Sequence, residues 1–219
     1  MKRIAVFLAL VIFITLPSFS QDEKKVEINT SMGKMIIKLY NETPEHRDNF
    51  LKLAKEGFYD SLLFHRVINN FMIQTGDPNS RGADRGEMLG MGGPGYTIPA
   101  EFNEKYYHKK GSLAAARKGD AVNPNKESSG SQFYIVQGQV LTPEQLNVYV
   151  SRGRHKPFTQ QQIDDYTTIG GTPHLDDAYT VFGEVIEGME VIDKIASVPV
   201  DNYNRPVEDV VITSIKVLN

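Results

Sequence analysis

Residues 64–77 read Phe64-His65-Arg66-Val67-Ile68-Asn69-Asn70-Phe71-Met72-Ile73-Gln74-Thr75-Gly76-Asp77. Two short apolar runs flank the pair Asn69-Asn70, which tolerates the positive φ of a tight turn, so the segment predicts a β-hairpin. Side chains alternate along a strand, and we therefore expect His65 to face away from Arg66. The second strand would set three side chains beside the Arg66 guanidinium, namely Phe71, Met72 and Gln74. This combination is typical of an apolar pocket with a polar rim, and equally of a core hairpin that carries a surface arginine.

Further runs with strand character occur on both sides of this hairpin. They lie at residues 26–29, 34–40, 111–116, 131–137, 179–185 and 207–217. Two helices are predicted between them, one that begins at Thr43-Pro44 and ends before Gly57, and one over residues 188–197. Many short strands with so few helices favour a β-rich barrel or sandwich over alternating βαβ units.

Residues 138–173 differ in character from the rest of the chain. Thr142-Pro143-Glu144-Gln145 and Thr159-Gln160-Gln161-Gln162 both fit the capping-box pattern, and they predict short helices over residues 143–152 and 160–167. Strand patterns lie on either side. We therefore expect this segment to be an insertion that leaves the domain surface and returns, because long surface insertions cost little closure entropy.

The first twenty residues have the pattern of a secretory signal peptide. Met1-Lys2-Arg3 is basic, residues 4–16 are apolar, and the small residues Ser18 and Ser20 follow. The apolar run is shorter than the roughly 20 residues that span a bilayer. We expect cleavage near Ser20, which would leave residues 21–219 as a single domain outside the cytoplasm, periplasmic or secreted. The mature form is expected to be a monomer without membrane attachment.

Composition argues against several classes of protein. The formal charge of −3 becomes −5 once Lys2 and Arg3 are removed with the signal peptide, so nucleic acid is not an expected partner. There is no cysteine, which excludes thiol chemistry and disulfides. Residues 90–95 match the dinucleotide fingerprint G-x-G-x-x-G, but Tyr96-Thr97-Ile98-Pro99 follows in place of the helix that the fingerprint requires. No cofactor is expected.

Metal binding is also not expected. The five histidines, at positions 46, 65, 108, 155 and 174, show no paired spacing of the kind that ligates zinc. His174 with Asp176 and Asp177 could ligate a cation, but we interpret these residues as a solvated turn before the next strand.

Three motifs resemble, in order, those of the cyclophilin-type peptidyl-prolyl isomerases. The first is the hairpin segment at residues 64–77. The second is Gly130-Ser131-Gln132-Phe133-Tyr134-Ile135, and the third is Val181-Phe182-Gly183-Glu184-Val185 with Gly188-Met189. The likeness covers residues 26–217 and is interrupted by the insertion. The sequence is similar in type to bacterial members of the family that carry a signal peptide.

The resemblance implies a mainly β fold, a closed eight-stranded antiparallel β-barrel capped by two α-helices. The capping helices would be residues 44–56 and 188–197, and the helical insertion would occupy about residues 138–173. The implied activity is peptidyl-prolyl cis-trans isomerisation of X-Pro bonds in secreted or periplasmic polypeptides, which assists their folding. Expected partners are proline-containing peptides and unfolded secreted proteins.

The resemblance also implies a set of site residues. Arg66 would be the catalytic cation. The substrate-binding positions would be Phe71, Met72, Gln74, Gly90, Ala116, Arg117, Gln132, Tyr134, His174, Leu175 and Tyr179. Tyr134 stands where phenylalanine is common in the family, and its added hydroxyl must find a partner or water.

An alternative function from another class is a proline-peptide binding module or holdase chaperone in which turnover is incidental. The presence of Arg66 beside Phe71, Met72 and Gln74 favours the isomerase, because a binding module does not need a cation at the prolyl nitrogen. The insertion favours the alternative to the extent that its helices could hold a client beside the groove.

Overall fold

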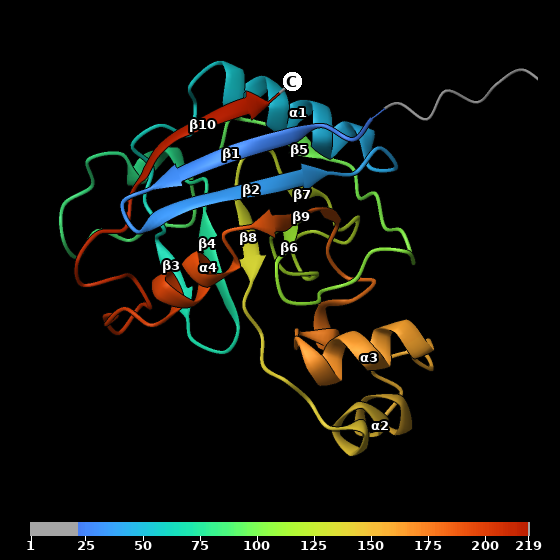
Figure 1. Ribbon diagram of the computed structural model, residues 1–219. Helices are drawn as coiled ribbons and strands as arrows, with labels where there is room; N and C mark the ends of the chain where they lie inside the picture. Colours follow the sequence, from blue (N-terminus) through green and yellow to red (C-terminus); the bar gives the residue numbers. More distant parts are fainter. Residues whose placement is uncertain (1–21, 219) are drawn as a thin grey trace, which may run out of the picture.

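A computed structural model describes residues 22–218, and its main element is one strongly curled antiparallel sheet (Figure 1). The strands of this sheet are β1 (Lys25–Thr30), β2 (Gly33–Leu39), β3 (Arg66–Ile68), β4 (Met72–Thr75), β6 (Ser112–Ala115), β8 (Phe133–Val136), β9 (Val181–Glu187) and β10 (Ile212–Leu218). Their order is β10-β1-β2-β9-β6-β8-β4-β3. The two-residue strands β5 (Thr97–Ile98) and β7 (Ser128–Ser129) form a separate pair that the sequence did not predict.

The predicted closure of the barrel was wrong. In residues 22–218, β3 and β10 are the two edges of the eight-stranded sheet, and no strand ladder joins them. The start of β10 instead meets the segment before β3. The Phe64 amide donates to the Val210 carbonyl at 2.9 Å, and Ile212 exchanges backbone hydrogen bonds of 2.8 Å with Ser61 and Leu62. The reason lies at Val67, whose N–H donates to the carbonyl of Asn204 at 2.8 Å, so a loop occupies the edge where β10 would pair. The sheet is therefore an open half-barrel.

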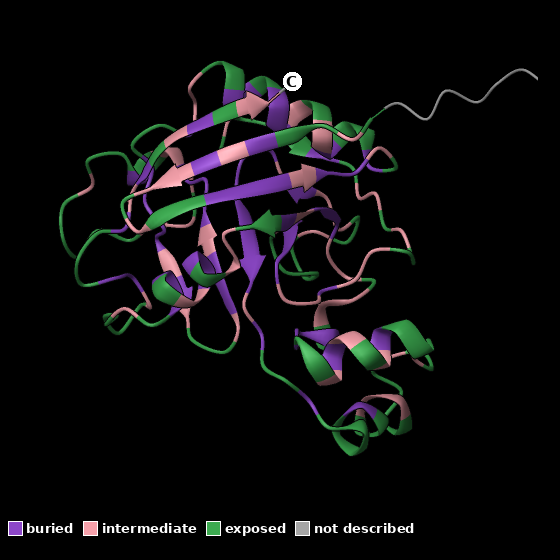
Figure 2. Ribbon diagram, in the orientation of Figure 1, coloured by how far each residue is buried: buried purple, intermediate pink, exposed green. Residues whose placement is uncertain are grey.

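Two helices pack against the sheet, as predicted. α1 (Pro44–Lys55) packs against β9 and β10, and α4 (Met189–Ala196) packs against β2, β3 and β4. The buried core lies between them and the concave face of the sheet, and its fully buried members include Ile28, Ile37, Leu39, Phe50, Phe64 and Ile73. Figure 2 shows the buried residues along the strands. Each such side chain stabilises the fold by about 1.5–3 kcal/mol.

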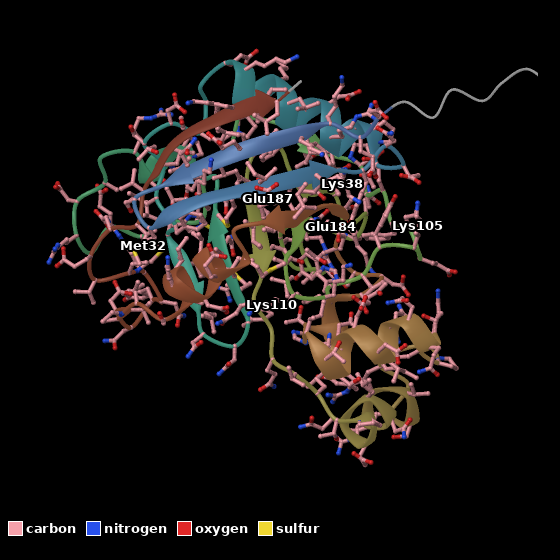
Figure 3. All side chains as sticks on the ribbon, in the orientation of Figure 1. Met32, Lys38, Lys105, Lys110, Glu184 and Glu187 are labelled. Atoms are coloured by element: carbon pink, nitrogen blue, oxygen red, sulfur yellow. The ribbon has the colours of Figure 1, made fainter. Side chains whose placement is uncertain are left out.

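Charged side chains cover the outer surface of the same strands. Lys38 on β2 lies 2.9 Å from Glu184 on β9, and Figure 3 shows this pair among the side chains of the surface. Lys109 also contacts Glu184, at 3.0 Å. These pairs are only partly exposed, but ion pairs at a protein surface contribute about 0–1 kcal/mol each, so burial of the core rather than surface charge stabilises the sheet.

The insertion folds as the sequence predicts, with α2 (Pro143–Ser151) and α3 (Gln160–Thr168). Both capping boxes form, at Thr142 and at Thr159. The two helices extend away from the sheet (Figure 1). They are not a purely superficial excursion, because Tyr166 is fully buried and Gly171 bridges to both Lys109 and Gln139.

The described residues also include two single-turn 3₁₀ helices, η1 (Pro78–Ser80) and η2 (Pro173–Leu175). Among residues 22–218, none of the helices has the length and apolar character needed to cross a membrane. The predicted signal peptide at residues 1–20 lies outside the described residues.

Candidate functional site

The candidate site is a cavity of about 390 Å³ beside the hairpin of β3 and β4. It lies on the face of the sheet opposite the core, because strand alternation turns Ile73 and Ile135 inward and Met72 and Tyr134 outward. The outward apolar residues form a second cluster of their own, separate from the core.

Strand register brings three side chains of the site into one row with Ala114, which is buried and does not line the cavity. Arg66 of β3 is paired with Gln74 of β4, Gln74 with Tyr134 of β8, and Tyr134 with Ala114 of β6. Directly opposed residues of antiparallel strands hold their Cβ atoms about 4.5–5.5 Å apart. The backbone ladder therefore fixes which side chains are neighbours in the cavity.

Arg66 is the cation of this row, and it has no carboxylate partner among the described residues. Its Nη1 donates to Gln74 Oε1 at 3.2 Å, and its guanidinium carbon lies 6.0 Å from the centroid of the Phe71 ring. Two other arginines line the cavity, but Arg117 pairs with Asp120 and Arg205 pairs with Asp209. Within the described part of the chain, no carboxylate forms an ion pair with Arg66. Its charge is directed at the cavity.

The wall next to Arg66 is apolar. It is formed by Phe71, Met72, Tyr134, Leu175 and Tyr179, which belong to one packed cluster. Met72 and Tyr134 are buried, and the Tyr134 and Tyr179 rings meet edge to face with centroids 5.9 Å apart. Such a surface accepts a compact apolar ring but offers little to a charged group.

A hydrogen-bonded loop forms the third side of the cavity. Gln74 Nε2 donates to Gln132 Oε1 at 3.0 Å, and Gln132 Nε2 donates to the carbonyls of Gly90 at 3.0 Å and Gly92 at 2.7 Å. From beneath, the buried Asp77 carboxylate accepts the N–H groups of Gly90 and Gly92. A Cβ at Gly92 would lie 2.0 Å from Asp77 Oδ1, so only glycine allows this approach.

Ten of the twelve predicted site residues line this one cavity, namely Arg66, Phe71, Met72, Gln74, Gly90, Ala116, Arg117, Tyr134, Leu175 and Tyr179. The remaining two lie behind or beside it. Gln132 is 6% exposed and links Gln74 to the glycine loop. His174 stacks on the Phe71 ring with centroids 5.5 Å apart.

Sequence reasoning missed several residues of the cavity. They are His65, Glu87, Met88, Leu89, Asp201, Tyr203 and Arg205. The predicted orientation of His65, away from Arg66, was wrong because β3 begins only at Arg66, and strand alternation does not extend to the residue before it. Burial lowers the pKa of His65 to about 4, so its ring is neutral at neutral pH. No local sequence pattern places the loop at residues 201–205 in the site, because the loop is held there by a hydrogen bond between residues far apart in the chain, Val67 and Asn204.

The turn at His174, Asp176 and Asp177 was predicted to be solvated; His174 and Asp177 are exposed, but the prediction was wrong for Asp176. The Asp176 side chain is 4% exposed and accepts hydrogen bonds from His108, His155 and Tyr166. These donors lie far apart in the sequence, which is why no local pattern indicated a buried carboxylate.

Residues 25–217 match the family model of the cyclophilin type peptidyl-prolyl cis-trans isomerases. A Staphylococcus haemolyticus protein named for this activity is 39% identical over 200 residues, which cover 90% of this chain and 92% of that protein. A Staphylococcus aureus protein with the same name is 39% identical over 201 residues, covering 90% and 93%.

Solved structures agree with the family match. The crystal structure of a Cryptosporidium parvum cyclophilin type isomerase superposes with a TM-score of 0.64 at 25% identity, covering 90% of this chain and 98% of that chain. The structure of that protein in the presence of the dipeptide Ala-Pro gives a TM-score of 0.63 at 24% identity, a likeness of fold. A family match over nearly the whole chain, two relatives at 39% identity and a shared fold leave one assignment: this chain belongs to the cyclophilin-type peptidyl-prolyl cis-trans isomerases.

Proposed function

We propose that Arg66 is the catalytic cation of this isomerase and that its substrates are X-Pro bonds in polypeptides outside the cytoplasm. The observation that carries the first part is the Arg66 guanidinium, which has no carboxylate partner among the described residues and lies beside an apolar wall. Support for the second part is the signal-peptide pattern of residues 1–20. The expected partners are proline-containing peptides and unfolded secreted proteins.

Rotation about an X-Pro bond breaks no covalent bond but must lose amide resonance, a barrier of about 18–20 kcal/mol. During rotation the prolyl nitrogen becomes pyramidal and gains a lone pair. A guanidinium directed at that nitrogen stabilises the lone pair only in the transition state, which is the condition for catalysis. Arginine suits this role because it stays charged and holds its donors in a fixed plane.

The other residues divide into those that hold the ring and those that hold the backbone. Phe71, Met72, Tyr134 and Leu175 would enclose the proline ring while the carbonyl side turns. Gln74 has both ends of its amide occupied, by Arg66 and by Gln132, so it orients the cation. The peptide backbone would contact the edge formed by Gly90, Ala116 and Arg117, with Gln132 behind this edge holding the glycine loop, and His174 and Tyr179 would lie at the rim.

The test is Arg66→Ala in a protease-coupled isomerase assay on a short X-Pro peptide. Loss of a charge-assisted contact worth roughly 1.5–3 kcal/mol predicts a fall in kcat/KM of about ten- to a hundredfold. Arg66→Lys is the matched control, because it keeps the charge without the planar fork and should recover only part of the rate. Near-normal turnover by a folded Arg66→Ala protein would contradict the proposal.

The binding-module alternative predicts a different outcome for the same variants. A holdase would suppress aggregation of an unfolded protein equally well with and without Arg66. An isomerase should accelerate the proline-limited phase in refolding of a model protein, and Arg66→Ala should abolish that acceleration. The presence of Arg66 in the cavity favours the isomerase.

A further inference from the structure

The Tyr134 hydroxyl is directed away from the cavity. The ring of Tyr134 forms part of the apolar wall, while its oxygen lies 2.9 Å from Nε2 of His108, a residue with no exposed surface. The added hydroxyl that the sequence left without a partner therefore has a buried one. This bond holds the hydroxyl end of the Tyr134 side chain in place, and it therefore fixes the torsion about the Cα–Cβ bond that positions the ring.

The Tyr134 hydroxyl is one of two contacts of the His108 ring. Nδ1 of His108 lies 2.8 Å from Asp176 Oδ1, and the His108 backbone N–H donates to the same oxygen at 2.8 Å. A carboxylate only accepts, so Nδ1 carries a proton and donates to Asp176. A phenol hydroxyl can donate or accept, so Tyr134 bonds to Nε2 whichever of the two atoms carries the proton.

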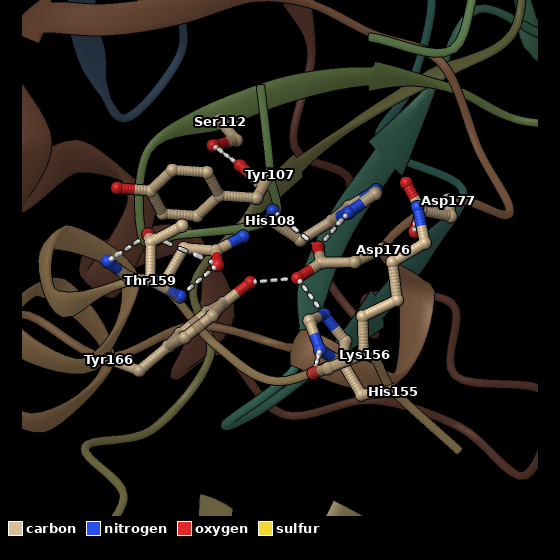
Figure 4. A network of polar contacts seen from close by, with 10 residues as sticks. Tyr107, His108, Ser112, His155, Lys156, Thr159, Tyr166, Asp176 and Asp177 are labelled. Carbon is tan, nitrogen blue, oxygen red and sulfur yellow. Dashed lines mark hydrogen bonds and ion pairs between the residues drawn. The ribbon is translucent and has the colours of Figure 1, made fainter. Parts of the chain in front are cut away.

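Asp176 is in turn held by the insertion. Its other oxygen accepts from Tyr166 Oη at 2.6 Å and from His155 Nε2 at 3.1 Å, as Figure 4 shows. Nδ1 of His155 lies 2.6 Å from the Lys156 carbonyl. Both neighbours of the His155 ring are acceptors, so the doubly protonated imidazolium satisfies both contacts. The insertion thereby supplies two of the donors to one buried carboxylate, Tyr166 from α3 and His155 from the loop between α2 and α3.

We propose that His108 and Asp176 are positioning residues for the proline pocket, and that Tyr166 and His155 of the insertion set the orientation of the Tyr134 ring through them. This inference rests on the proposed function, because it takes the Tyr134 ring as a wall of the substrate pocket. The chain of contacts is continuous, from insertion to carboxylate to imidazole to phenol, and its members are almost fully buried. Buried polar networks act as units, so removing a distant member affects the last one.

The experiment is a double-mutant cycle on the full chain with kcat/KM for an X-Pro peptide and the unfolding temperature as readouts. Tyr166→Phe is made in the wild type and in a Tyr134→Phe background. We expect Tyr166→Phe to lower kcat/KM on the order of three- to tenfold in the wild type, within the coupling range of contacting residues. In the Tyr134→Phe background the same substitution should leave kcat/KM unchanged, because the hydroxyl that transmits its effect is absent.

Tyr107→Phe is the matched control. The Tyr107 hydroxyl also donates to a carboxylate at this interface, that of Asp165, but it makes no bond to Asp176. It should lower the unfolding temperature without changing kcat/KM. A second route is His108→Asn, which keeps an N–H toward Asp176 and loses the ring nitrogen that contacts the Tyr134 hydroxyl. Its effect on kcat/KM should also vanish in the Tyr134→Phe background.

Two results would overturn the inference. One is an equal loss of kcat/KM from Tyr166→Phe in both backgrounds, which would indicate a general structural role. The other is a folded Tyr166→Phe protein with wild-type kcat/KM. If turnover still depends on Arg66, either result rejects the positioning role and leaves the proposed function in place. Turnover that is insensitive to Arg66→Ala rejects the proposed function instead.

Discussion

The two walls of the cavity are held in different ways. The hairpin wall, with Arg66 and Met72, is fixed by the backbone ladder and by the core behind it. Tyr134 of β8 belongs to the same ladder, but the position of its ring also depends on buried polar groups, which include the Asp176 carboxylate. Ladder register depends on many equivalent bonds, whereas a buried carboxylate depends on each of its few donors. The first wall should therefore tolerate loss of a side chain, and the second should not.

The largest expected effect is on stability, from Asp176→Asn. Removing one member of a buried charged pair costs about 3–5 kcal/mol, because the remaining donors are left buried and unmatched. Arg66→Ala, in the hairpin wall, should change the free energy of unfolding by less than about 1 kcal/mol, since Arg66 is half-buried and makes one hydrogen bond to a side chain. Urea denaturation of both variants measures the difference. Equal urea midpoints of unfolding for Asp176→Asn and Arg66→Ala would contradict the idea that the two walls are held in different ways.

A smaller effect on stability is expected from a change of pH. It should act through His155, which belongs to the polar network behind the Tyr134 wall and not to the hairpin wall. Burial lowers the pKa of His155, but its hydrogen bonds to Asp176 and to the Lys156 carbonyl outweigh this and raise the pKa above the ordinary value. A raised pKa in the folded state means that the stabilisation is complete below about pH 6.5 and is lost as pH rises through the folded value. The unfolding temperature should therefore fall in that range.

His155→Gln is the control for this prediction, because glutamine keeps a donor toward Asp176 and does not titrate. The other charged groups around His155 are Asp177, Lys156 and Glu104. The hydrogen bond between Lys156 and Glu104 raises the pKa of Lys156 and lowers the pKa of Glu104, which moves both values away from neutral pH. An unchanged pH slope in His155→Gln would assign the dependence to another group.

The smallest expected effect is on turnover. Arg66 does not titrate between pH 6 and 9, and the lowered pKa of His65 keeps its ring neutral there. Partial burial and the nearby His108 lower the pKa of His174 as well. Neutral His155 can still donate to Asp176, so the Tyr134 wall stays in place. We expect kcat/KM to vary less than about twofold over this range. A bell-shaped profile that persists in His174→Gln would mean that a proton transfer contributes to the reaction.

The sequence predicts the parts of this molecule that follow local rules. The Asn69-Asn70 turn gives a hairpin with Asn70 at a φ of 60°, and the capping boxes at Thr142 and Thr159 form. Thr43 makes no capping bond with its side chain, because the Glu101 carboxylate accepts the first amides of α1 from a distant loop.

What the sequence could not predict depends on contacts between distant residues. His108 and Asp176 are 68 positions apart, and Val67 meets Asn204 across most of the chain. Local sequence patterns describe residues that are close in the chain. Residue propensity and spacing therefore carry no information about which distant residues meet. Ten of the twelve residues that the resemblance implies lie around one cavity, but the resemblance could not give the partner of the Tyr134 hydroxyl, which is a departure from the family pattern.

The loop that ends the sheet at β3 has a consequence for solubility. An unpaired edge strand presents free N–H and C=O groups on which another chain can add a strand. Here Asn204, in the left-handed region at a φ of 64°, caps the Val67 amide, so that the exposed end of the half-barrel offers no template at this position. The same loop lines the cavity with Asp201 and Tyr203. A segment that lines the cavity therefore also protects the folded protein from adding its sheet to that of a neighbour.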